Sequence, residues 1–595
     1  MASLYLSFYR ARANAFGDLP PRISVPGRWL GARLLALLLI LAFVSPVLWR
    51  EGWPRDHEWR RNFDRIEVYA QHFARGELFP VWSDSAVVGY GGPFPIYYHK
   101  LFYYPAGMLR LLGVSLKGAV VLTLAGFAWL GLAGMQRVLD RWQRGPPAVV
   151  TLVAAGFLFS SYAYQLWVVR GAYAEFSAMM LVPWGLLWCW EVIERPGERR
   201  WGWMGMALFP ALYFAHSIIF FYFAGPVVVA VLIGWGRCAA KRGFAVRMLA
   251  LGAWFFLLVG PVIGLQQVLG EGFGVFEGIL LYRAEEHIWP LSALWWTPDF
   301  AWGERWRPLS LAFNPVSLAG VGLGVGWLGV KLWQGRGSWR SPSAEAMLER
   351  RRWLAGIGFL AFGLYYVFWM SPLARPLYAA WEAFSLLQFP FRLLCFLTAA
   401  VPVFLWIGVG RWVAGRRTPV VAGVFGGYAL LFALFSPWVH PIRYEWMPRA
   451  EIEHVYGPET TIWVGYAEYA PRIGERDSHG RMDRLRFELL PHPGTRAWET
   501  DAYAVARIDD GGFEAGKRRY RVIAEQDATV VLPIAYSPFL RVFAESGEGR
   551  QALEIWRTDE DPRVHFTLPA GTHHVQVRYP TVGRTFVQLL REGAP

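Results

Sequence analysis

Long apolar stretches recur through the first 437 residues of the chain, and short polar segments separate them. The hydrocarbon core of a bilayer is about 30 Å thick, so a helix that spans it needs roughly 20 mainly apolar residues. The pattern predicts about eleven spanning helices. They are expected at 34–50, 116–136, 147–167, 176–194, 203–216, 218–236, 248–268, 311–330, 353–370, 393–410 and 418–437.

The polar segments between these stretches differ in charge in a regular way. Every second segment is short and rich in Arg, which is typical of loops on the cytoplasmic side of a membrane. These segments are 137–144, 195–200, 237–247, 331–352 and 411–417. The basic segment 1–33 lacks a small-residue cleavage signal and is expected to stay in the cytoplasm. The remaining segments, expected outside, are 51–115, 168–175, 269–310, 371–392 and the chain after 437.

Two regions leave alternatives open. The apolar runs that meet at His216 form either a tight helical hairpin or one longer bent element, and the alternation elsewhere favours the hairpin. Residues 97–115 are interrupted by Lys100 and Arg110, and Pro105 is expected to break a helix there. We therefore expect this segment to be re-entrant or to lie at the membrane surface.

The pattern changes from about residue 475. Short alternating runs at 520–525, 529–533, 565–568 and 574–579 are separated by Gly and Asp, which predicts strands joined by turns. The fold class is therefore a polytopic α-helical membrane domain, 34–437, a connecting segment, 438–474, and a C-terminal β-sandwich or jelly roll, 475–595. Such a β-domain either binds glycan or caps the membrane part.

Composition narrows the possible functions. Hydrophobic residues make up 55% of the chain, and the net charge of +14 comes from short clusters between apolar runs rather than from one basic face. This distribution argues for a lipid bilayer, and not nucleic acid, as the partner of the basic residues. The three cysteines, Cys189, Cys238 and Cys395, indicate neither a disulfide framework nor a thiolate metal site. No P-loop, kinase loop or dinucleotide fingerprint occurs.

Ionisable residues gather directly after the first predicted helix, beginning with Asp56, His57 and Glu58 and continuing to Arg65. The spacing brings Asp56 and Glu58 close together. A partly desolvated carboxylate can take the proton of an acceptor hydroxyl, and a second can orient the acceptor or hold a metal. A solvated charged loop would have the same composition, so only the surrounding residues can distinguish a catalytic pair of carboxylates from such a loop.

Other ionisable residues fall at the outer ends of the predicted helices, whereas ion-coupled transporters tend to carry them near mid-membrane. If a polyprenyl-phosphate sugar is the donor, its departing phosphate gains negative charge at the outer interface. Arg170 and Arg392 are candidates to bind that phosphate, with His216 as a helper. Snorkelling arginines and a structural His are the alternatives. Candidate substrate contacts are His57, Arg65, Tyr97, Tyr98, Glu175, Arg283, Glu285, His287 and Gln388.

Several segments together resemble one family. Residues 56–105 contain Gly76-Glu77-Leu78-Phe79-Pro80-Val81-Trp82, Gly89-Tyr90-Gly91-Gly92-Pro93 and Tyr104-Pro105, and later come Arg170-Gly171-Ala172-Tyr173-Ala174-Glu175, Ala215-His216-Ser217, Gln388-Phe389-Pro390-Phe391-Arg392 and Glu468-Tyr469-Ala470-Pro471. In this order they resemble bacterial multi-pass proteins labelled 6-pyruvoyl-tetrahydropterin synthase-related, and YfhO-like proteins. The family is similar to the GT-C glycosyltransferase superfamily. Phe391 replaces the usual Trp and Ala470 the usual Leu of these motifs.

The resemblance implies a polyprenyl-phosphate-linked sugar donor, a periplasmic active site in the bacterial inner membrane, and an acidic residue after the first span as base. Asp56 takes that role, with Glu58 second. The acceptor would be a hydroxyl of a glycan, lipid or protein, and the transfer would invert the configuration of the anomeric carbon. A divalent cation is sometimes bound in this superfamily. Donor identity is expected to depend on loop 269–310, whose Trp residues at 295, 296, 302 and 306 stack on sugars or anchor the interface. A lipid or glycan transporter and a non-catalytic envelope scaffold are the alternatives.

Overall fold

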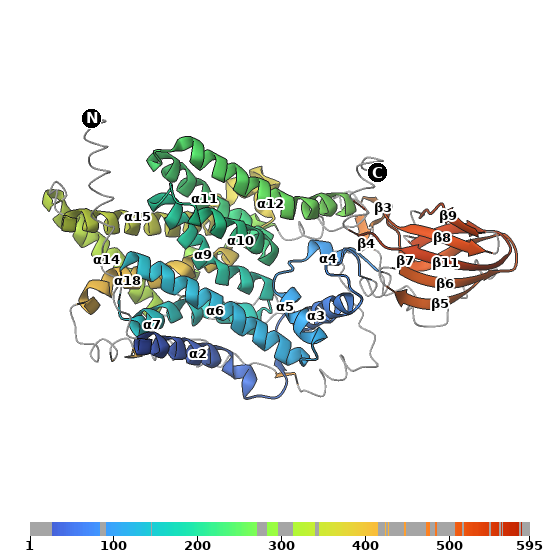
Figure 1. Ribbon diagram of the computed structural model, residues 1–595, viewed down its shortest axis with the longest axis horizontal. Coiled ribbons are helices and arrows are strands. Elements are labelled where there is room, and N and C mark those ends of the chain that lie inside the picture. Colours follow the sequence, from blue (N-terminus) through green and yellow to red (C-terminus); the bar gives the residue numbers. More distant parts are fainter. Residues whose placement is uncertain are drawn as a thin grey trace.

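A helical body and a β-domain make up the computed structural model (Figure 1). The structure describes residues 26–83, 91–143, 145–270, 283–294, 313, 315–338, 344–414, 423, 426–427, 446–447, 472–476, 482–484, 506–514, 517–546, 549–558, 561, 563–581 and 585. The predicted helix at 418–437, the Trp-rich part of loop 269–310 and the signature at 468–471 lie almost wholly outside these residues.

The first ten predicted apolar runs correspond to helical segments of the described chain. These are α2 (Pro26–Leu48), α6 (Leu116–Trp142), α7 (Pro147–Leu158), α9 (Tyr173–Glu194), α10 (Arg200–Ala215), α11 (Ser217–Arg237), α12 (Lys241–Gly270), α14 (Pro315–Ser338), α15 (Ala344–Met370) and α18 (Leu394–Ala414). Eight helices in the described part of the chain are long and apolar enough to cross a membrane. Of the most hydrophobic part of α18, 89% is buried inside the protein, whereas only 17% of the corresponding part of α12 is buried. Helix α18 therefore lies at the centre of the bundle and α12 at its periphery.

The predicted helix at 147–167 is not continuous. Helix α7 ends at Leu158, and the chain resumes as α8 (Ser161–Tyr164) and a π-helix, η2 (Gln165–Val169), bent by 55° from α7. Ser160 caps the second piece, because its hydroxyl accepts a hydrogen bond from the Ala163 N–H at 3.2 Å. The bend and the π-helix together present Arg170 at the end of the pair. π-Helical turns inside helices often occur at functional sites.

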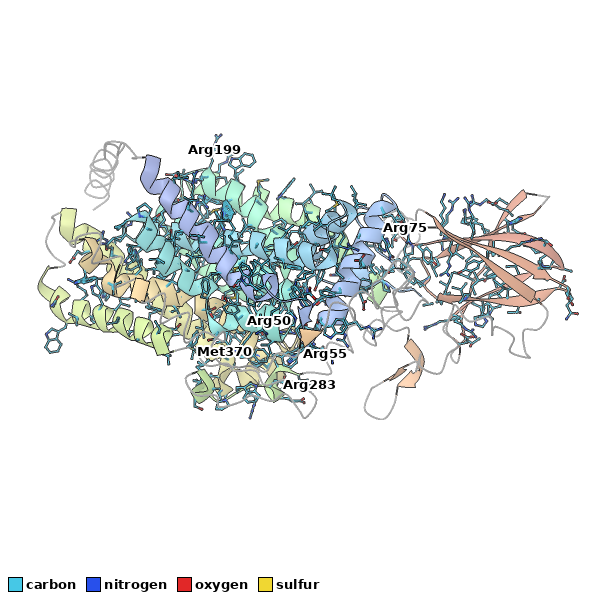
Figure 2. All side chains as sticks on the ribbon, turned by 90° about the horizontal axis from the view of Figure 1, so that it is seen from below. Arg50, Arg55, Arg75, Arg199, Arg283 and Met370 are labelled. Carbon is cyan, nitrogen blue, oxygen red and sulfur yellow. The ribbon has the colours of Figure 1, made fainter. Side chains whose placement is uncertain are left out.

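The Arg-rich segments meet at one end of the helical body. Glu194 pairs with Arg237 at 3.3 Å and with Arg351 at 2.5 Å, and Arg141 pairs with Glu191 at 2.5 Å. Figure 2 shows Arg199 on this side, and Arg50, Arg55, Arg283 and Met370 toward the opposite side. Segments that the sequence analysis assigns to the same side of a membrane are therefore neighbours in space.

The two apolar runs at 203–236 form the predicted hairpin. His216 has an extended backbone, φ −166° and ψ 103°, so it ends α10 and begins α11. Both helices pack on α9. Helix α10 has 16 residues and is about 24 Å long from end to end.

Three short helices form a layer over the ends of the bundle that lie away from the Arg-rich segments (Figure 1). They are α3 (Trp59–Ala74), α4 (Phe94–Tyr97) and α5 (Tyr103–Leu111), and α3 packs on α5. The expectation that Pro105 breaks a helix is wrong. Pro105 is the third residue of α5, where its missing N–H would have had no partner within the helix. Met108, Leu111 and Leu112 are exposed, which suits a segment lying at a membrane surface.

The C-terminal strands form two antiparallel sheets. The larger has the order β5-β6-β11-β8-β9 and the smaller pairs β10 with β7. One hydrophobic core lies between them and includes Val522, Leu532, Val542, Phe566 and Val577. The strands are β5 (Ala506–Glu514), β6 (Lys517–Ala524), β7 (Ala528–Ala535), β8 (Arg541–Ser546), β9 (Gly549–Leu553), β10 (Arg563–Leu568) and β11 (Gly571–Arg578), with a further pair β3 (Arg472–Arg476) and β4 (Met482–Arg484). The predicted C-terminal region of strands is thus confirmed as antiparallel sheets in the described residues.

Several contacts join the parts of the chain, including a buried cluster of Phe539 with Val81, Ile96 and Leu265. Trp82 stacks on Tyr579 at 5.7 Å between ring centroids, and Val68, Trp82 and Phe94 share the core of the β-domain. Far from these in sequence, β1 (Trp53–Pro54) pairs antiparallel with β2 (Trp446–Met447). The strand that leads into Asp56 is therefore fixed by residues that follow the helical bundle.

Candidate active site

Asp56 lies buried beside the C-terminal end of α2 and the N-terminal end of α9, with 4% of its surface exposed. Its Oδ1 accepts a hydrogen bond from the Glu58 N–H at 2.9 Å. Its Oδ2 receives only long contacts, from Trp53 Nε1 and from the Tyr173 hydroxyl, each at 3.4 Å. Oδ2 thus retains capacity for a shorter hydrogen bond from another donor. Burial raises the pKa of Asp56 well above its usual value, although the hydrogen bond from Glu58 opposes this.

Backbone geometry brings Asp56 next to the π-helix. The His57 N–H donates to the Val169 carbonyl at 3.0 Å, which ties the loop after α2 to the turn before Arg170. Gly171 follows with φ +65°, a conformation that favours glycine. A Cβ atom at Gly171 would stand only 2.7 Å from Asp56 Cγ and 3.0 Å from Asn62 Nδ2. The absence of a side chain at position 171 is what allows the carboxylate to fit.

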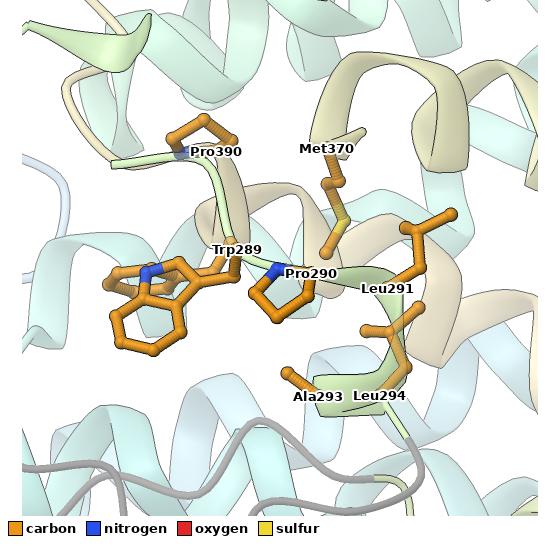
Figure 3. Close-up of a pocket in the computed structure, with 8 residues that line it drawn as sticks. Trp289, Pro290, Leu291, Ala293, Leu294, Met370 and Pro390 are labelled. Carbon is orange, nitrogen blue, oxygen red and sulfur yellow. The ribbon is translucent and has the colours of Figure 1, made fainter. Parts of the chain in front are cut away.

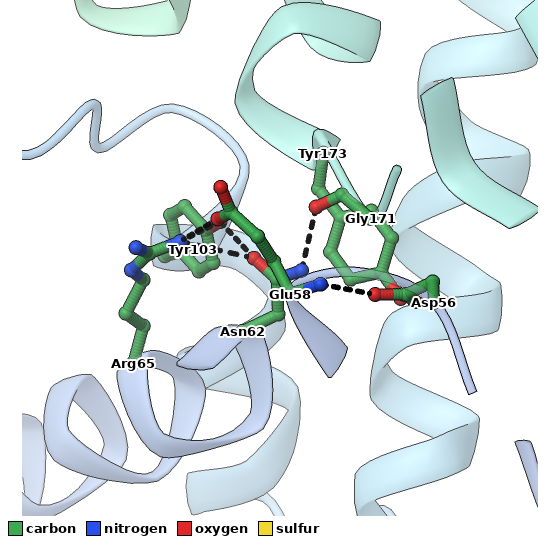
Figure 4. A network of polar contacts seen from close by, with 7 residues as sticks. All are labelled: Asp56, Glu58, Asn62, Arg65, Tyr103, Gly171 and Tyr173. Atoms are coloured by element: carbon green, nitrogen blue, oxygen red, sulfur yellow. Dashed lines mark hydrogen bonds and ion pairs between the residues drawn. The ribbon is translucent and has the colours of Figure 1, made fainter. Parts of the chain in front are cut away.

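Glu58 faces a second group of residues, shown in Figure 4. Arg65 donates to Glu58 at 3.1 Å, to Asn62 Oδ1 at 3.2 Å and to the Tyr103 hydroxyl at 3.3 Å. Its guanidinium also lies over the Tyr98 ring, 3.5 Å from the centroid. Burial alone would raise the pKa of Glu58, but Arg65 and other nearby arginines outweigh it and lower the pKa. Glu58 is one-third exposed and ionised, whereas Asp56 is enclosed and harder to ionise.

Arg170 and Arg392 meet on one buried carboxylate. Arg170 pairs with Glu175 at 3.0 Å, and Arg392 Nε lies 3.6 Å from the same carboxylate. The Tyr162 hydroxyl also donates to Glu175. Arg392 further donates to the Gln388 side chain at 3.1 Å, and Gln388 has φ +60°, unusual for a residue with a side chain. Arg170 is next to Gly171 and hence to Asp56, so the two arginines and the aspartate belong to one cluster.

Two histidines lie next to the arginines of this cluster. The rings of His99 and His216 are stacked, 4.2 Å apart and 11° from parallel. His216 Nδ1 accepts from the Ile219 N–H at 3.4 Å as the cap of α11, so its proton is on Nε2. His99 Nε2 lies 3.1 Å from the Ser217 hydroxyl. Burial lowers the pKa of both rings well below the usual value, and Arg392 adds to the effect in each case.

Lys100 is a further buried cation beside His99. Its Nζ donates to the Ile96 carbonyl at 3.0 Å, and burial lowers its pKa to about 7. A lysine held near neutrality can change its charge in the physiological range. Lys100 appears in the sequence only as an interruption of an apolar run, and nothing in that pattern marks it as part of a site.

The remaining predicted contacts lie at or beyond the edge of the cluster. Glu285 accepts a hydrogen bond from Ser385 at 2.7 Å, and His287 contacts the Phe389 ring edge-on at 4.9 Å. Arg283 is largely exposed and pairs loosely with Glu285 at 3.8 Å. The Tyr97 hydroxyl donates to the Gln266 carbonyl of α12. The Tyr97 side chain therefore points away from the cluster.

An apolar hollow adjoins the arginines. Its lining is Trp289, Pro290, Leu291, Ala293, Leu294, Met370, Pro390 and Phe391 (Figure 3). Phe391 also contacts Arg170, whose guanidinium carbon is 5.0 Å from the ring centroid. The hollow therefore places apolar surface directly beside the positively charged group.

Several residues of the cluster escaped the sequence analysis. They are Trp53, Asn62, His99, Tyr103, Tyr162 and Tyr173. Asn62 donates to the Gly171 carbonyl at 2.6 Å and so links α3 to the turn at Arg170. The one available signal was that Asn62 and Arg65 stand three residues apart, on the same face of a helix if 59–74 is helical.

Among the described residues, no group of three or more His, Cys, Asp or Glu side chains is arranged to hold a metal ion. Comparisons with known proteins gave no family-model match and no significant match among curated proteins.

Proposed function

We propose that this chain is a multi-pass glycosyltransferase of a bacterial inner membrane. It would transfer a sugar from a polyprenyl-phosphate donor to a hydroxyl group at the periplasmic face. The observation that carries the proposal is the convergence of one enclosed carboxylate with two arginines and a histidine pair at the same end of the helices. The resemblance of the sequence motifs to GT-C enzymes supports the same reaction class.

The chemistry follows from the charges. The acceptor oxygen attacks the anomeric carbon, its proton passes to Asp56 Oδ2, and the bond from the anomeric carbon to the phosphate oxygen breaks. A raised pKa makes Asp56 a better proton acceptor than an ordinary aspartate. The departing phosphate gains negative charge, which Arg170 and Arg392 stabilise electrostatically. A single displacement of this kind inverts the anomeric configuration.

The surroundings suit the two halves of such a donor. The apolar surface at Phe391 would contact prenyl carbons, and Arg170, whose guanidinium carbon is 5.0 Å from the Phe391 ring centroid, would contact the phosphate. Glu58 and Arg65 are held by Asn62 and Tyr103 in a fixed arrangement, and they would orient the acceptor. Because Gln388 holds the Arg392 guanidinium, we assign it a positioning role.

Membrane placement rests on the sorting of charge between the two ends of the helices. Arg-rich segments gather at the end that contains Glu194, and the candidate site lies at the other. The positive-inside rule then puts the site and the β-domain in the periplasm. A reporter fused after residue 595 tests this placement, because activity of the reporter in the cytosol would contradict it.

The test of transfer begins with mass spectrometry of lipid-linked and envelope glycans in cells that lack the protein. We expect one glycan to lose a sugar, and Asp56→Asn to give the same loss at normal abundance. Glu198→Gln is the matched control, since Glu198 is half exposed at the far end. Normal glycans in the Asp56→Asn strain would contradict the proposal. Unmodified precursor trapped on the cytoplasmic side would favour a transporter instead.

A further inference from the structure

Basic residues gather on the outer face of the five-stranded sheet. Residues directly opposite one another in antiparallel strands share a face. The register places Lys517 opposite Arg578, and Arg578 opposite Arg541, so three cations form one row across β6, β11 and β8. The next row contains Arg519, Gln576 and Phe543. Arg541 and Arg519 are exposed, and Lys517 and Arg578 are half-buried.

The arrangement is unfavourable for the isolated sheet. Like charges directly opposite one another in neighbouring strands destabilise the pairing. The β-domain has acidic residues, but most described ones lie elsewhere: Glu525 and Asp527 are at the β6–β7 turn, and Asp561 pairs with Arg563 at 2.6 Å. On the basic face the register adds Asp509 opposite Arg521, Glu514 opposite Lys517, and Glu545, which pairs with Arg550 at 3.8 Å. Among the described residues of this face, the cations Lys517, Arg519, Arg521, Arg541, Arg550 and Arg578 therefore outnumber the acidic side chains.

Two of the arginines are held in place. Gln576 Oε1 accepts from Arg550 at 2.8 Å and from Arg578 at 3.1 Å. Both guanidinium groups also lie against the Phe543 ring, 4.1 Å and 5.0 Å from its centroid. Side chains that are already ordered lose less conformational entropy when they bind a ligand. Guanidinium groups bind carboxylates in a planar, two-bonded geometry.

We propose that this face, formed by Lys517, Arg519, Arg541, Arg550 and Arg578 around Phe543, binds a linear polysaccharide that carries carboxylate groups. Strands in a sheet are about 4.8 Å apart, so the rows present cations along an extended, flat track rather than in a pocket. Such a track fits a chain with repeated charges. Figure 1 shows the strands extending away from the helical body, which leaves room for a long polymer beside them. The inference concerns binding and does not depend on sugar transfer.

The test measures binding of the full-length protein in uncharged detergent to polygalacturonate by isothermal titration calorimetry. We expect measurable binding that weakens as salt is added, and no binding to neutral dextran. The double variant Lys517→Gln/Arg541→Gln should bind about tenfold more weakly, because two exposed charge contacts are lost. Its melting temperature should stay close to the parent's, because the loss of the Lys517 charge opposite Glu514 is offset by the relief of repulsion between Lys517 and Arg578.

Arg557→Gln is the matched control. Arg557 follows Trp556, which bridges to His565 of β10, so it belongs to the other sheet, and this variant should bind normally. Unchanged affinity in the double variant would overturn the proposal. So would equal binding to dextran, or binding to vesicles of phosphatidylglycerol and phosphatidylcholine with no binding to polygalacturonate, which would indicate a lipid surface.

Discussion

The rings of His99 and His216 stack at 4.2 Å, and each histidine comes from a different loop at the outer end of the bundle. His216 separates α10 from α11, and His99 lies between α4 and α5. Their contact joins the layer of short helices to the bundle, next to the arginines that we propose bind phosphate. Because two imidazoles this close cannot both take a proton easily, the pair also makes the protein sensitive to acid.

The first prediction concerns that sensitivity. Both histidines have a lowered pKa in the folded protein, whereas in the unfolded chain it is about 6.5. Below that pH the unfolded chain takes up protons that the folded protein does not, so stability should fall progressively as pH drops. His216→Asn keeps a capping side chain for α11 and should make this fall less steep. Melting temperatures of the parent and of the variant between pH 5 and 8 measure how steeply stability falls. The same substitution at the exposed His574 should leave the slope unchanged.

The second prediction concerns the carboxylate between two arginines. Glu175→Gln leaves Arg170 and Arg392 close together without their shared negative partner. Breaking a buried ion pair on one side typically costs about 3–5 kcal/mol of unfolding free energy. We expect a large drop in melting temperature and in sugar transfer. Glu198→Gln, which removes an exposed pair 3.4 Å long, should change neither. A Glu175→Gln variant as stable as the parent would show that the arginines do not depend on Glu175.

The third prediction separates backbone strain from crowding. Gly171 and Gly76 both have positive φ, +65° and +79°, but only Gly171 faces occupied space. Gly76→Ala should cost about 1 kcal/mol from backbone strain alone. Gly171→Ala should cost about 1–3 kcal/mol more, because its methyl group must displace Asp56. Equal costs in thermal unfolding would mean that the carboxylate moves aside freely.

The fourth prediction uses the raised pKa of Asp56. A carboxyl group whose pKa is higher in the folded protein than in the unfolded chain stabilises the fold below the unfolded value, about 3.9, and this stabilisation is lost as pH rises through the folded value. Asp56→Asn removes the charge, so the variant should be more stable than the parent at neutral pH, and the difference should shrink toward pH 4. For the same reason the parent's transfer rate should rise with pH through the weakly acidic range. A stability difference between variant and parent that is the same at pH 4 and at neutral pH would contradict the raised pKa of Asp56.

Much of the helical architecture could be predicted from the sequence because an apolar run of spanning length has few other stable states. The alternation of Arg-rich segments also predicted that Arg170, Glu175, His216 and Arg392 lie at one end, and ion pairs join Arg170 and Arg392 to Glu175. The break after Leu158 was missed, since a bend within an apolar run leaves the hydrophobic pattern unchanged. Helix α3 was treated as part of an outer loop because only long apolar runs were interpreted as helices, whereas α3 is apolar on one face alone.

The contacts around Asp56 could not be predicted for a different reason. Trp53, Asn62 and Tyr173 come from three elements, and their approach depends on the close packing of Gly171 against the carboxylate. No local pattern encodes such an approach. Residue types at a site can be expected from sequence, but which hydroxyl or amide meets which carboxylate is decided by tertiary packing.

The pairing of Trp53–Pro54 with Trp446–Met447 has a consequence for how the protein is made. Asp56 leaves the ribosome early, on the first segment to follow a membrane helix, yet the strand before it has no partner until residues 446–447 have been synthesised. A chain truncated before residue 446 would therefore carry every proposed reacting group but would lack the strand that pairs with the segment before Asp56.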